Sequence, residues 1–464
     1  MAFTETIFRH DDGESGVNFT GTWWKDELHL IPAAYDADAR IYVGAREGDD
    51  WILVGPSHAT SRITVRAGRG DDYVWTSFSD FLNNSLWDGD NGDDYFVLQG
   101  GGIGSTLKGG DGNDEIAVTN PISRYLINGN AGIDVLAIHS NAFQSTIRGG
   151  EGQDVIRLSR KIDSSIIQGD DNDDSLVVGY ASNIQLDNST INGNSGNDVI
   201  TVERISSFVQ SEIRGGADND QITATSSAHS LSLFGDSGND TIASGAGADS
   251  IDGGLGNDVL TGWAGDDTIT AGNGSDTITG GGGNDSINLF AAFGSNSVNY
   301  TELTSANGTD RVSSFSVARG DKMTFLNGQI TGFANTLAGT TINNASTAAL
   351  ADQTTPIGVD DNEIYVINEV AEERNIDSVA DMVVALAGGG ALDAVDITQG
   401  AGNVAALIVS AADNSRNAYL YGFVDNGASG NVDAAELTLL SVTTSSNSFA
   451  WAGTPFNTGS FSFS

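Results

Sequence analysis

The stretch Leu233–Ile287 decides the fold of this chain and reads LFGDSGNDTIASGAGADSIDGGLGNDVLTGWAGDDTITAGNGSDTITGGGGNDSI. Aliphatic residues recur in it with a strict period of nine, at Leu233, Ile242, Ile251, Leu260, Ile269, Ile278 and Ile287. The turns between them end in aspartate and are rich in glycine, which tolerates the positive φ of a tight turn. One such unit buries almost nothing alone, so the period predicts parallel coils stacked around a continuous apolar column.

The cleanest unit, Gly253–Leu260, fits the nonapeptide G-G-x-G-x-D-x-U-x, in which U is aliphatic. Six turns in register resemble the calcium-binding repeats of the RTX (repeats-in-toxin) family. Aspartate and carbonyl oxygens are hard ligands, which suit Ca²⁺ better than a transition metal. The resemblance implies an all-β chain: a right-handed parallel β-helix or β-roll solenoid with calcium-binding turns, followed by a mainly β C-terminal domain. It also implies that each Ca²⁺ is shared between turns on successive coils of one edge.

A longer repeat precedes this stretch, with turns that end in aspartates 20 to 24 residues apart. Apolar residues follow each turn at the second and fourth positions, as Ile116 and Val118 follow Asp114. This alternation predicts a strand with one buried face, and a polar loop and a second strand complete the unit. We therefore expect coils with a calcium turn on one edge and an irregular loop, such as TNPISR, on the other.

The last residue of each well-formed turn is the predicted metal ligand. The turns that end in Asp50 and Asp72 are doubtful, because Arg46 or Ala67 replaces a glycine. The predicted ligands are Asp94, Asp114, Asp134, Asp154, Asp174, Asp198, Asp220, Asp240, Asp249, Asp258, Asp267, Asp276 and Asp285. One ion between successive turns of an edge predicts roughly 10–13 Ca²⁺ per chain.

The repeats divide the chain into four expected regions. Residues 1–40 form an N-terminal cap, in which Trp23 and Trp24 cover the first coil. Residues 41–240 form the solenoid with one calcium edge, and residues 241–290 form the tandem nonapeptide β-roll. Residues 291–464 form a mainly β domain with a secretion signal. Their segment GTDRVSSFSVARGDKMTF resembles the one that closes the roll in secreted RTX proteases.

Composition limits the partners. Among the 464 residues, 62 acidic against 20 basic side chains give a formal charge of −42, which argues against nucleic acid and anionic membranes. Without bound cations this charge opposes compaction, so we expect the chain to fold on binding Ca²⁺. There are no cysteines, which excludes disulfides and thiolate metal sites. No stretch approaches the roughly 20 apolar residues of a membrane span.

The first residues, MAFTETIFRHDDGESG, show neither a basic n-region nor an apolar h-region. Because RTX proteins typically leave the cell by type I secretion, we expect that apparatus as a partner and an extracellular or cell-surface location. The expected role is structural: a surface-layer, filament or adhesion component, through self-assembly or a surface or matrix partner. No catalytic or cofactor-binding residue is assigned.

A polysaccharide lyase or epimerase is the alternative, because parallel β-helices often host such enzymes. Its groove requires clustered basic, tyrosine or histidine side chains on one strand face. The nearest approach to such a cluster is Arg157, Arg160 and Lys161, with Tyr125 and His139. The histidines form no HExxH motif, so a metalloprotease is not predicted.

Two ladders of side chains support the register of the long coils. The serines two residues before the second-strand aliphatic are expected to be buried and structural: Ser85, Ser105, Ser145, Ser165, Ser189 and Ser211. Outward residues beside the turns include three cations, which are expected to screen the acidic edge: Asp88, Lys108, Asn128, Arg148, Gln168, Asn192 and Arg214.

Two further features have open interpretations. Residues 425–436 resemble an EF-hand loop, with Gly430 at the sharp turn and Glu436 at the twelfth position, but Gly427 stands where a ligand is expected and an acidic hairpin is the favoured interpretation. Trp263 occupies a glycine position of its turn, either as a contact point or as a tolerated departure.

Overall fold

A computed structural model describes residues 40–300, apart from gaps at 56–61, 77–82, 181–182, 225–227 and 291–292. It also describes 4–9, 15–21, 27–30, 310–315, 319 and 321–325, and the backbone of several later strands. The chain divides into two compact units, Met1–Thr241 and Ile242–Ser464. No α-helix occurs among the described residues, so the all-β class is confirmed.

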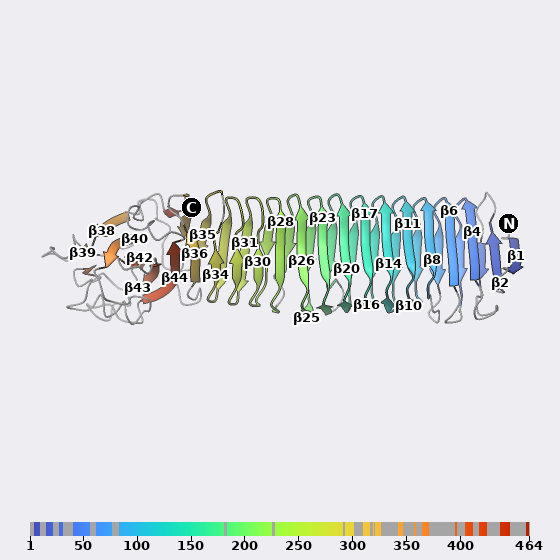
Figure 1. Ribbon diagram of the computed structural model, residues 1–464, viewed down its shortest axis with the longest axis horizontal. Coiled ribbons are helices and arrows are strands. Elements are labelled where there is room, and N and C mark those ends of the chain that lie inside the picture. The colour runs from blue at the N-terminus through green and yellow to red at the C-terminus, as the bar shows by residue number, and fades with distance from the viewer. Residues whose placement is uncertain are drawn as a thin grey trace. The chain divides into compact units, whose positions relative to one another are not determined.

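The first unit contains three sheets (Figure 1). In order of pairing, sheet 1 consists of β1 (Thr4–Arg9), β2 (Ser15–Thr20), β4 (Arg40–Glu47), β6 (Arg62–Arg69), β8 (Leu86–Asn91), β11 (Thr106–Asp111), β14 (Leu126–Ala131), β17 (Thr146–Glu151), β20 (Ile166–Asp171), β23 (Thr190–Ser195), β26 (Glu212–Ala217) and β28 (Ser232–Ser237). All its pairs are parallel except β1 with β2.

Sheets 2 and 3 are entirely parallel. Sheet 2 consists of β3 (Glu27–Leu30), β5 (Trp51–Val54), β7 (Tyr73–Thr76), β9 (Tyr95–Leu98), β12 (Glu115–Val118), β15 (Val135–Ile138), β18 (Val155–Leu158), β21 (Ser175–Val178), β24 (Val199–Val202) and β27 (Gln221–Thr223). Sheet 3 consists of β10 (Gly102–Ile103), β13 (Ile122–Ser123), β16 (Ala142–Phe143), β19 (Ile162–Asp163), β22 (Ile184–Asp187) and β25 (Ile205–Val209).

Each coil passes from sheet 1 through the aspartate-ending turn to sheet 2, and most coils then cross sheet 3. The period-2 pattern is observed, because Ile116 and Val118 are fully buried while Glu115 is exposed. Equivalent residues stack in register, as Ile116 does on Leu136. Each coil therefore adds one layer to the apolar column, and the predicted parallel solenoid is confirmed.

Sheet 3 occupies the loops that we expected to be irregular. In most of these loops at least one apolar residue is buried, as Ile122, Ala142 and Ile162 are, whereas Ile103 is 51 % exposed. Non-glycine residues with positive φ turn the chain after these short strands, including Arg124 and Gln144. Loops of different length therefore still form a regular third edge.

The serine ladder is buried at the end of these loops. The Ser165 hydroxyl accepts a hydrogen bond from the Ser145 backbone N–H at 3.0 Å and donates to the Asp163 carbonyl at 3.0 Å. The Ser189 hydroxyl does the same with Ser165 and Asp187. The hydroxyls therefore bridge the backbones of successive coils, and their repetition supports a structural role.

In the second unit the paired strands form two main sheets. One consists of β30 (Ser250–Asp252), β32 (Thr268–Thr270), β34 (Ser286–Asn288), β36 (Asp310–Phe315), β44 (Leu437–Ser445), β43 (Asn417–Val424), β42 (Val404–Ala411), β40 (Ile364–Val370) and β38 (Ile342–Ser346). The other consists of β31 (Val259–Ala264), β33 (Thr277–Gly282), β35 (Ser297–Tyr300), β37 (Lys322–Phe325) and β45 (Phe461–Phe463).

Two short strands, β39 (Ile357–Gly358) and β41 (Val395–Asp396), pair separately, and β29 (Thr241–Ala243) spans the boundary between the units. The nonapeptide anchors Ile251, Ile269 and Ile287 stack in parallel register and are buried. Coil geometry continues beyond them, because Val298 pairs with Ile278 and Met323 with Val298.

Candidate metal centre

All thirteen predicted ligands lie at the ends of turns and are at most 3 % exposed. Each stands directly before a strand, as Asp114 stands before β12. Isolated charges are expensive to bury, so carboxylates in these positions need hydrogen bonds or a cation. The surroundings of their oxygens therefore decide what the turns can do.

The first carboxylate oxygen of most of these aspartates accepts a hydrogen bond from the backbone of the preceding coil. The Asp114 backbone N–H donates to Asp134 Oδ1 at 2.7 Å, and the Asp134 N–H donates to Asp154 Oδ1 at 2.8 Å. Nine such bonds of 2.6 to 2.8 Å connect the aspartates that end successive turns, from Asp50 to Asp240. We call this series the aspartate ladder.

The second carboxylate oxygen is buried, and in most turns it accepts no hydrogen bond from any described residue. This holds for Oδ2 of Asp72, Asp94, Asp114, Asp134, Asp154, Asp174, Asp198, Asp220, Asp267 and Asp276. In the Gly109 turn, Asp114 Oδ2 and the Gly129 carbonyl oxygen both lie where a Cβ on Gly109 would stand. The first glycine of the turn thus leaves room for two oxygens, of which Asp114 Oδ2 has no hydrogen-bond donor among the described residues.

Burial has a strong effect on these carboxyl groups in the metal-free chain. It raises the pKa of Asp94 from 3.8 to about 8, and those of Asp114 and Asp134 to about 7. Hydrogen bonds from the backbone oppose this shift without cancelling it. A bound cation would stabilise the ionised form instead.

The oxygens fit Ca²⁺, which accepts carboxylate and carbonyl ligands in flexible numbers. Among the described residues no three acidic, histidine or cysteine side chains converge on one point. A site here would therefore combine one aspartate per turn with backbone carbonyls such as that of Gly129. Bound Ca²⁺ would supply the positive charge that these oxygens lack and would link successive coils.

The structure adds residues that the sequence analysis discounted or missed. Asp50 and Asp72 belong to the same ladder and are buried, although Ala45 and Ala67 fill the first glycine position of their turns. In the second unit, Asp285 N–H donates to Asp310 Oδ1 at 3.1 Å. The sequence signal for Asp310 is its place 25 residues after Asp285. In the structure it is the first residue of β36.

Asn296 and Asp321 likewise extend the other edge of the second unit. The Asp276 N–H donates to Asn296 Oδ1 at 2.9 Å, and the Asn296 N–H donates to Asp321 Oδ1 at 3.0 Å. Their turns lack the glycine pattern, so the nonapeptide motif does not find them.

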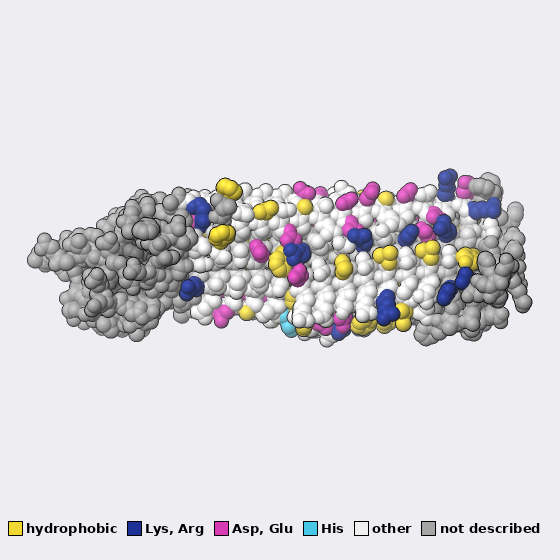
Figure 2. Space-filling view, viewed as in Figure 1, with side chains coloured by type: hydrophobic (Ala, Val, Ile, Leu, Met, Phe, Trp, Pro, Cys, Tyr) yellow, Lys and Arg dark blue, Asp and Glu magenta, His cyan; other side chains and the backbone are white. Residues whose placement is uncertain are grey.

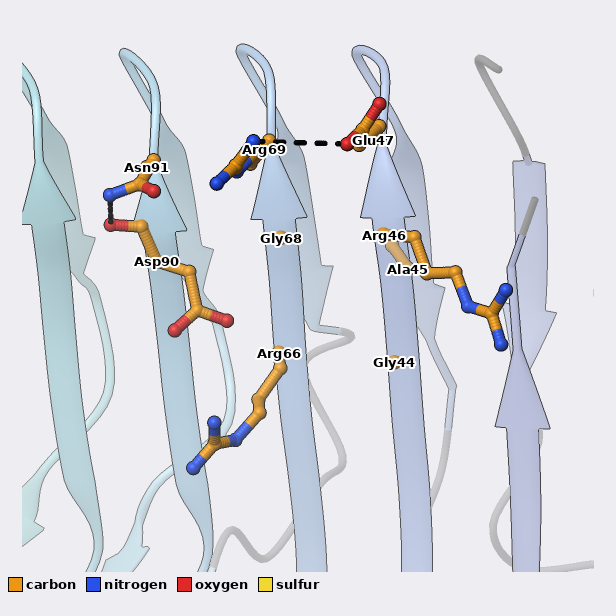
Figure 3. A pocket seen from close by; sticks show the side chains of 9 residues that line it. All are labelled: Gly44, Ala45, Arg46, Glu47, Arg66, Gly68, Arg69, Asp90 and Asn91. Carbon is orange, nitrogen blue, oxygen red and sulfur yellow. Dashed lines mark hydrogen bonds and ion pairs between the residues drawn. The ribbon is translucent and has the colours of Figure 1, made fainter. Parts of the chain in front are cut away.

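Outward cations lie beside the ladder, as the sequence predicts. Figure 2 shows Lys and Arg interspersed with Asp and Glu over the face formed by sheet 1. Arg148 Nε lies 3.1 Å from Asp170 Oδ2, and Arg214 Nη2 lies 2.7 Å from Asp236 Oδ1. In the first turns Arg69 pairs with Glu47 at 3.8 Å, as Figure 3 shows. These pairs offset the charge of other acidic side chains in the turns, whereas the ladder carboxylates are buried.

Three of the five residues named for a polysaccharide enzyme are buried or engaged in other contacts. Tyr125 is 2 % exposed, and burial raises its pKa to about 12. Lys161 Nζ lies 3.1 Å from both Asp163 Oδ2 and Asp187 Oδ2. The Arg157 guanidinium lies 5.5 Å from the centre of the Tyr180 ring.

Several predicted features lie outside the aspartate ladder. The EF-hand-like loop at 425–436 and the residues Trp23 and Trp24 lie outside the residues whose structure is described. Trp263 is 56 % exposed and has a φ of 71°. No helix suited to crossing a bilayer is found in the described part of the chain.

Comparison with known proteins supports the assignment of the turns. The family model of the RTX calcium-binding nonapeptide repeat matches four copies, at residues 186–203, 234–269 and 262–289. The first match falls in the long coils, so these also carry the nonapeptide pattern. No curated protein matches the chain. The resemblance to the RTX family is thus confirmed, and the chain is a β-solenoid with RTX calcium-binding nonapeptide repeats.

Proposed function

We propose that this protein is exported by type I secretion, folds by binding Ca²⁺ outside the cell, and serves a structural or interaction role at the cell surface or in the matrix. The aspartate ladder carries the proposal. It buries one carboxylate per coil, and most of these keep an oxygen without a donor. Successive coils lie about 4.8 Å apart, so ionised carboxylates repel along the whole edge unless cations lie between them.

Export follows from the same property. RTX repeat proteins are typically secreted by the type I route, which leads from a compartment poor in Ca²⁺ to one rich in it. Because the metal binds the native chain and not the unfolded one, folding is displaced to the outside. A chain that stays unfolded until export would suit passage through a secretion channel.

The repeat length supports a structural role. In the first unit, described strands form stacked coils across most of residues 40–241. Sheet 2 also presents outward aromatic rings: Trp51 is 52 % exposed, and its ring centre lies 4.9 Å from that of Tyr73. Exposed aromatic groups of this kind mark interaction surfaces.

A calcium titration tests the proposal. Purified full-length protein is freed of Ca²⁺ with a chelator at pH 7.5, and far-UV circular dichroism follows stepwise addition of Ca²⁺. We expect the β signal to appear cooperatively with Ca²⁺ and not with the same concentrations of Mg²⁺. A β signal that is complete in chelator and unchanged by Ca²⁺ would rule the mechanism out.

Imaging tests the structural role separately. Electron microscopy of the calcium-loaded protein should show ordered sheets or fibres that disperse when Ca²⁺ is removed. The variant Trp51→Ser should fold with Ca²⁺ but assemble less. Turnover of an acidic or neutral polysaccharide by a monomeric wild-type protein would instead support the enzyme alternative.

A further inference from the structure

One turn of the tandem repeat has the length and the final aspartate of the others but satisfies its oxygens differently. In the turn Ser244–Asp249, the Ser244 hydroxyl donates to the Gly262 carbonyl oxygen of the following coil at 2.7 Å. The Gly245 backbone N–H donates to Asp249 Oδ2 at 3.1 Å. Both acceptors therefore receive a hydrogen bond from the chain itself.

In a glycine turn the matching carboxylate oxygen, such as Asp114 Oδ2, has no hydrogen-bond donor among the described residues. Ser244 occupies the position of Gly109, Asp249 that of Asp114, and Gly262 that of Gly129. On the same edge, Gly262 begins the next turn, and Asp267 Oδ2 there lacks a hydrogen-bond donor among the described residues. The change from Gly to Ser at one position thus separates two neighbouring turns of one edge.

The other edge of the second unit ends in a similar way. Asp321, whose side chain is buried, receives Arg319 Nη2 at 2.6 Å on Oδ2 and Arg319 Nε at 3.2 Å on Oδ1. Arg319 Nη2 also donates to the carbonyls of Leu289 and Ser314 at 2.8 Å. A guanidinium fork on a carboxylate supplies both the charge and the hydrogen bonds that a cation would supply.

We propose that Ser244 and Arg319 are built-in substitutes for Ca²⁺, so that the turns of Asp249 and Asp321 hold their coils together without metal. At the Asp249–Asp267 step the Ser244 hydroxyl occupies the Gly262 carbonyl, and the Gly245 N–H occupies Asp249 Oδ2. Asp249 then acts as a structural acceptor rather than a calcium ligand. The inference rests on the proposed binding of Ca²⁺ by the glycine turns.

The test is the number of Ca²⁺ bound per full-length chain, measured by isothermal calorimetry and by elemental analysis after gel filtration. Ser244→Gly recreates the sequence GGAGAD and should gain one ion per chain. Ser250→Gly is the matched control. Ser250 is the exposed first residue of β30, directly after Asp249, so its substitution should leave the count unchanged. An unchanged count in Ser244→Gly would overturn the proposal.

Ser244→Ala separates the hydroxyl from the space that it fills. Its melting temperature should fall because the Gly262 carbonyl loses its donor. Arg319→Gln should lower the melting temperature of the calcium-loaded chain without changing the count. Wild-type protein that binds no Ca²⁺ would refute the proposed function, whereas normal binding with no gain in Ser244→Gly refutes only this inference.

Discussion

The turns Gly109–Asp114 and Ser244–Asp249 have equal length and bury their aspartates equally, yet their carboxylates differ in surroundings. Asp114 Oδ2 lies against a carbonyl oxygen with no donor among the described residues, whereas Asp249 Oδ2 accepts the Gly245 N–H. Burial of the aspartate therefore does not by itself make a metal site. What decides is whether the chain supplies a donor to the carboxylate oxygen that lies over the first residue of the turn.

The largest effect should come from pH in the absence of metal. Burial raises the pKa values of Asp94, Asp174 and Asp220 to about 8, against 3.8 for an ordinary aspartate. A carboxyl with a raised folded-state pKa holds its proton more tightly in the folded chain, so protonation stabilises the fold at low pH. That stabilisation is lost as pH rises through about 6 to 8.

We therefore expect chelated protein to show strong β circular dichroism near pH 5 and to lose most of it by pH 8. With Ca²⁺ in excess the signal should stay constant between pH 6 and 8, because the metal replaces the protons. A chelated chain that is equally folded at both pH values would show that the ladder carboxylates do not control stability.

The second effect concerns the space over the first glycine. A Cβ at Gly109 would collide with Asp114 Oδ2 and the Gly129 carbonyl oxygen, so Gly109→Ala should cost about 3 kcal/mol of stability in Ca²⁺. Gly44→Ala is the control, because a Cβ there meets nothing within 4 Å. Chemical denaturation in Ca²⁺ measures both, and equal costs would contradict the steric account.

The sequence predicts the repeat well because its period is set by stacking. Ile116 and Ile251 are buried as expected, and all thirteen aspartates lie in their turns. It predicts the donors poorly, because the acceptor of Ser244 lies 18 residues away in the next coil. The first position of the turn does not distinguish Asp276 from Asp50, because it is alanine in both turns (Ala271 and Ala45). Asp276 is nevertheless among the predicted ligands, whereas Asp50 is treated as doubtful.

Sheet 3 shows the same limit. Its strands have two to five residues, and one inward apolar residue such as Ile122 or Ile162 is too weak a pattern for a strand prediction. Their pairing depends on neighbouring coils whose loops differ in sequence. Non-local contacts of this kind have no signature within one repeat.

A third prediction compares the two aspartates by substitution. Asp134→Asn keeps one oxygen for the Asp114 N–H but replaces Oδ2 with an amide donor, which opposes metal binding. It should remove one Ca²⁺, lower stability in saturating Ca²⁺ by about 2 kcal/mol, and raise stability in chelator. Asp249→Asn should cost the same with and without Ca²⁺, since its oxygen bonds to the backbone. Thermal melts in both conditions distinguish the two, and a calcium-dependent cost at Asp249 would contradict the comparison.

The smallest effect concerns Trp263, which occupies the second position of a turn in this same repeat. Its φ of 71° is unfavourable for a bulky side chain, whereas Asn130 and Asn194 take φ near 80° at the equivalent position of their turns. The indole is 56 % exposed, so removing it loses little apolar burial. Trp263→Asn should therefore stabilise the calcium-loaded chain by about 1 kcal/mol, measured as a higher melting temperature. Trp51→Asn is the control and should destabilise, because Trp51 lies in a strand and stacks on Tyr73. A loss of stability in Trp263→Asn would mean that the indole makes a favourable contact in its turn, and that its φ is compensated there.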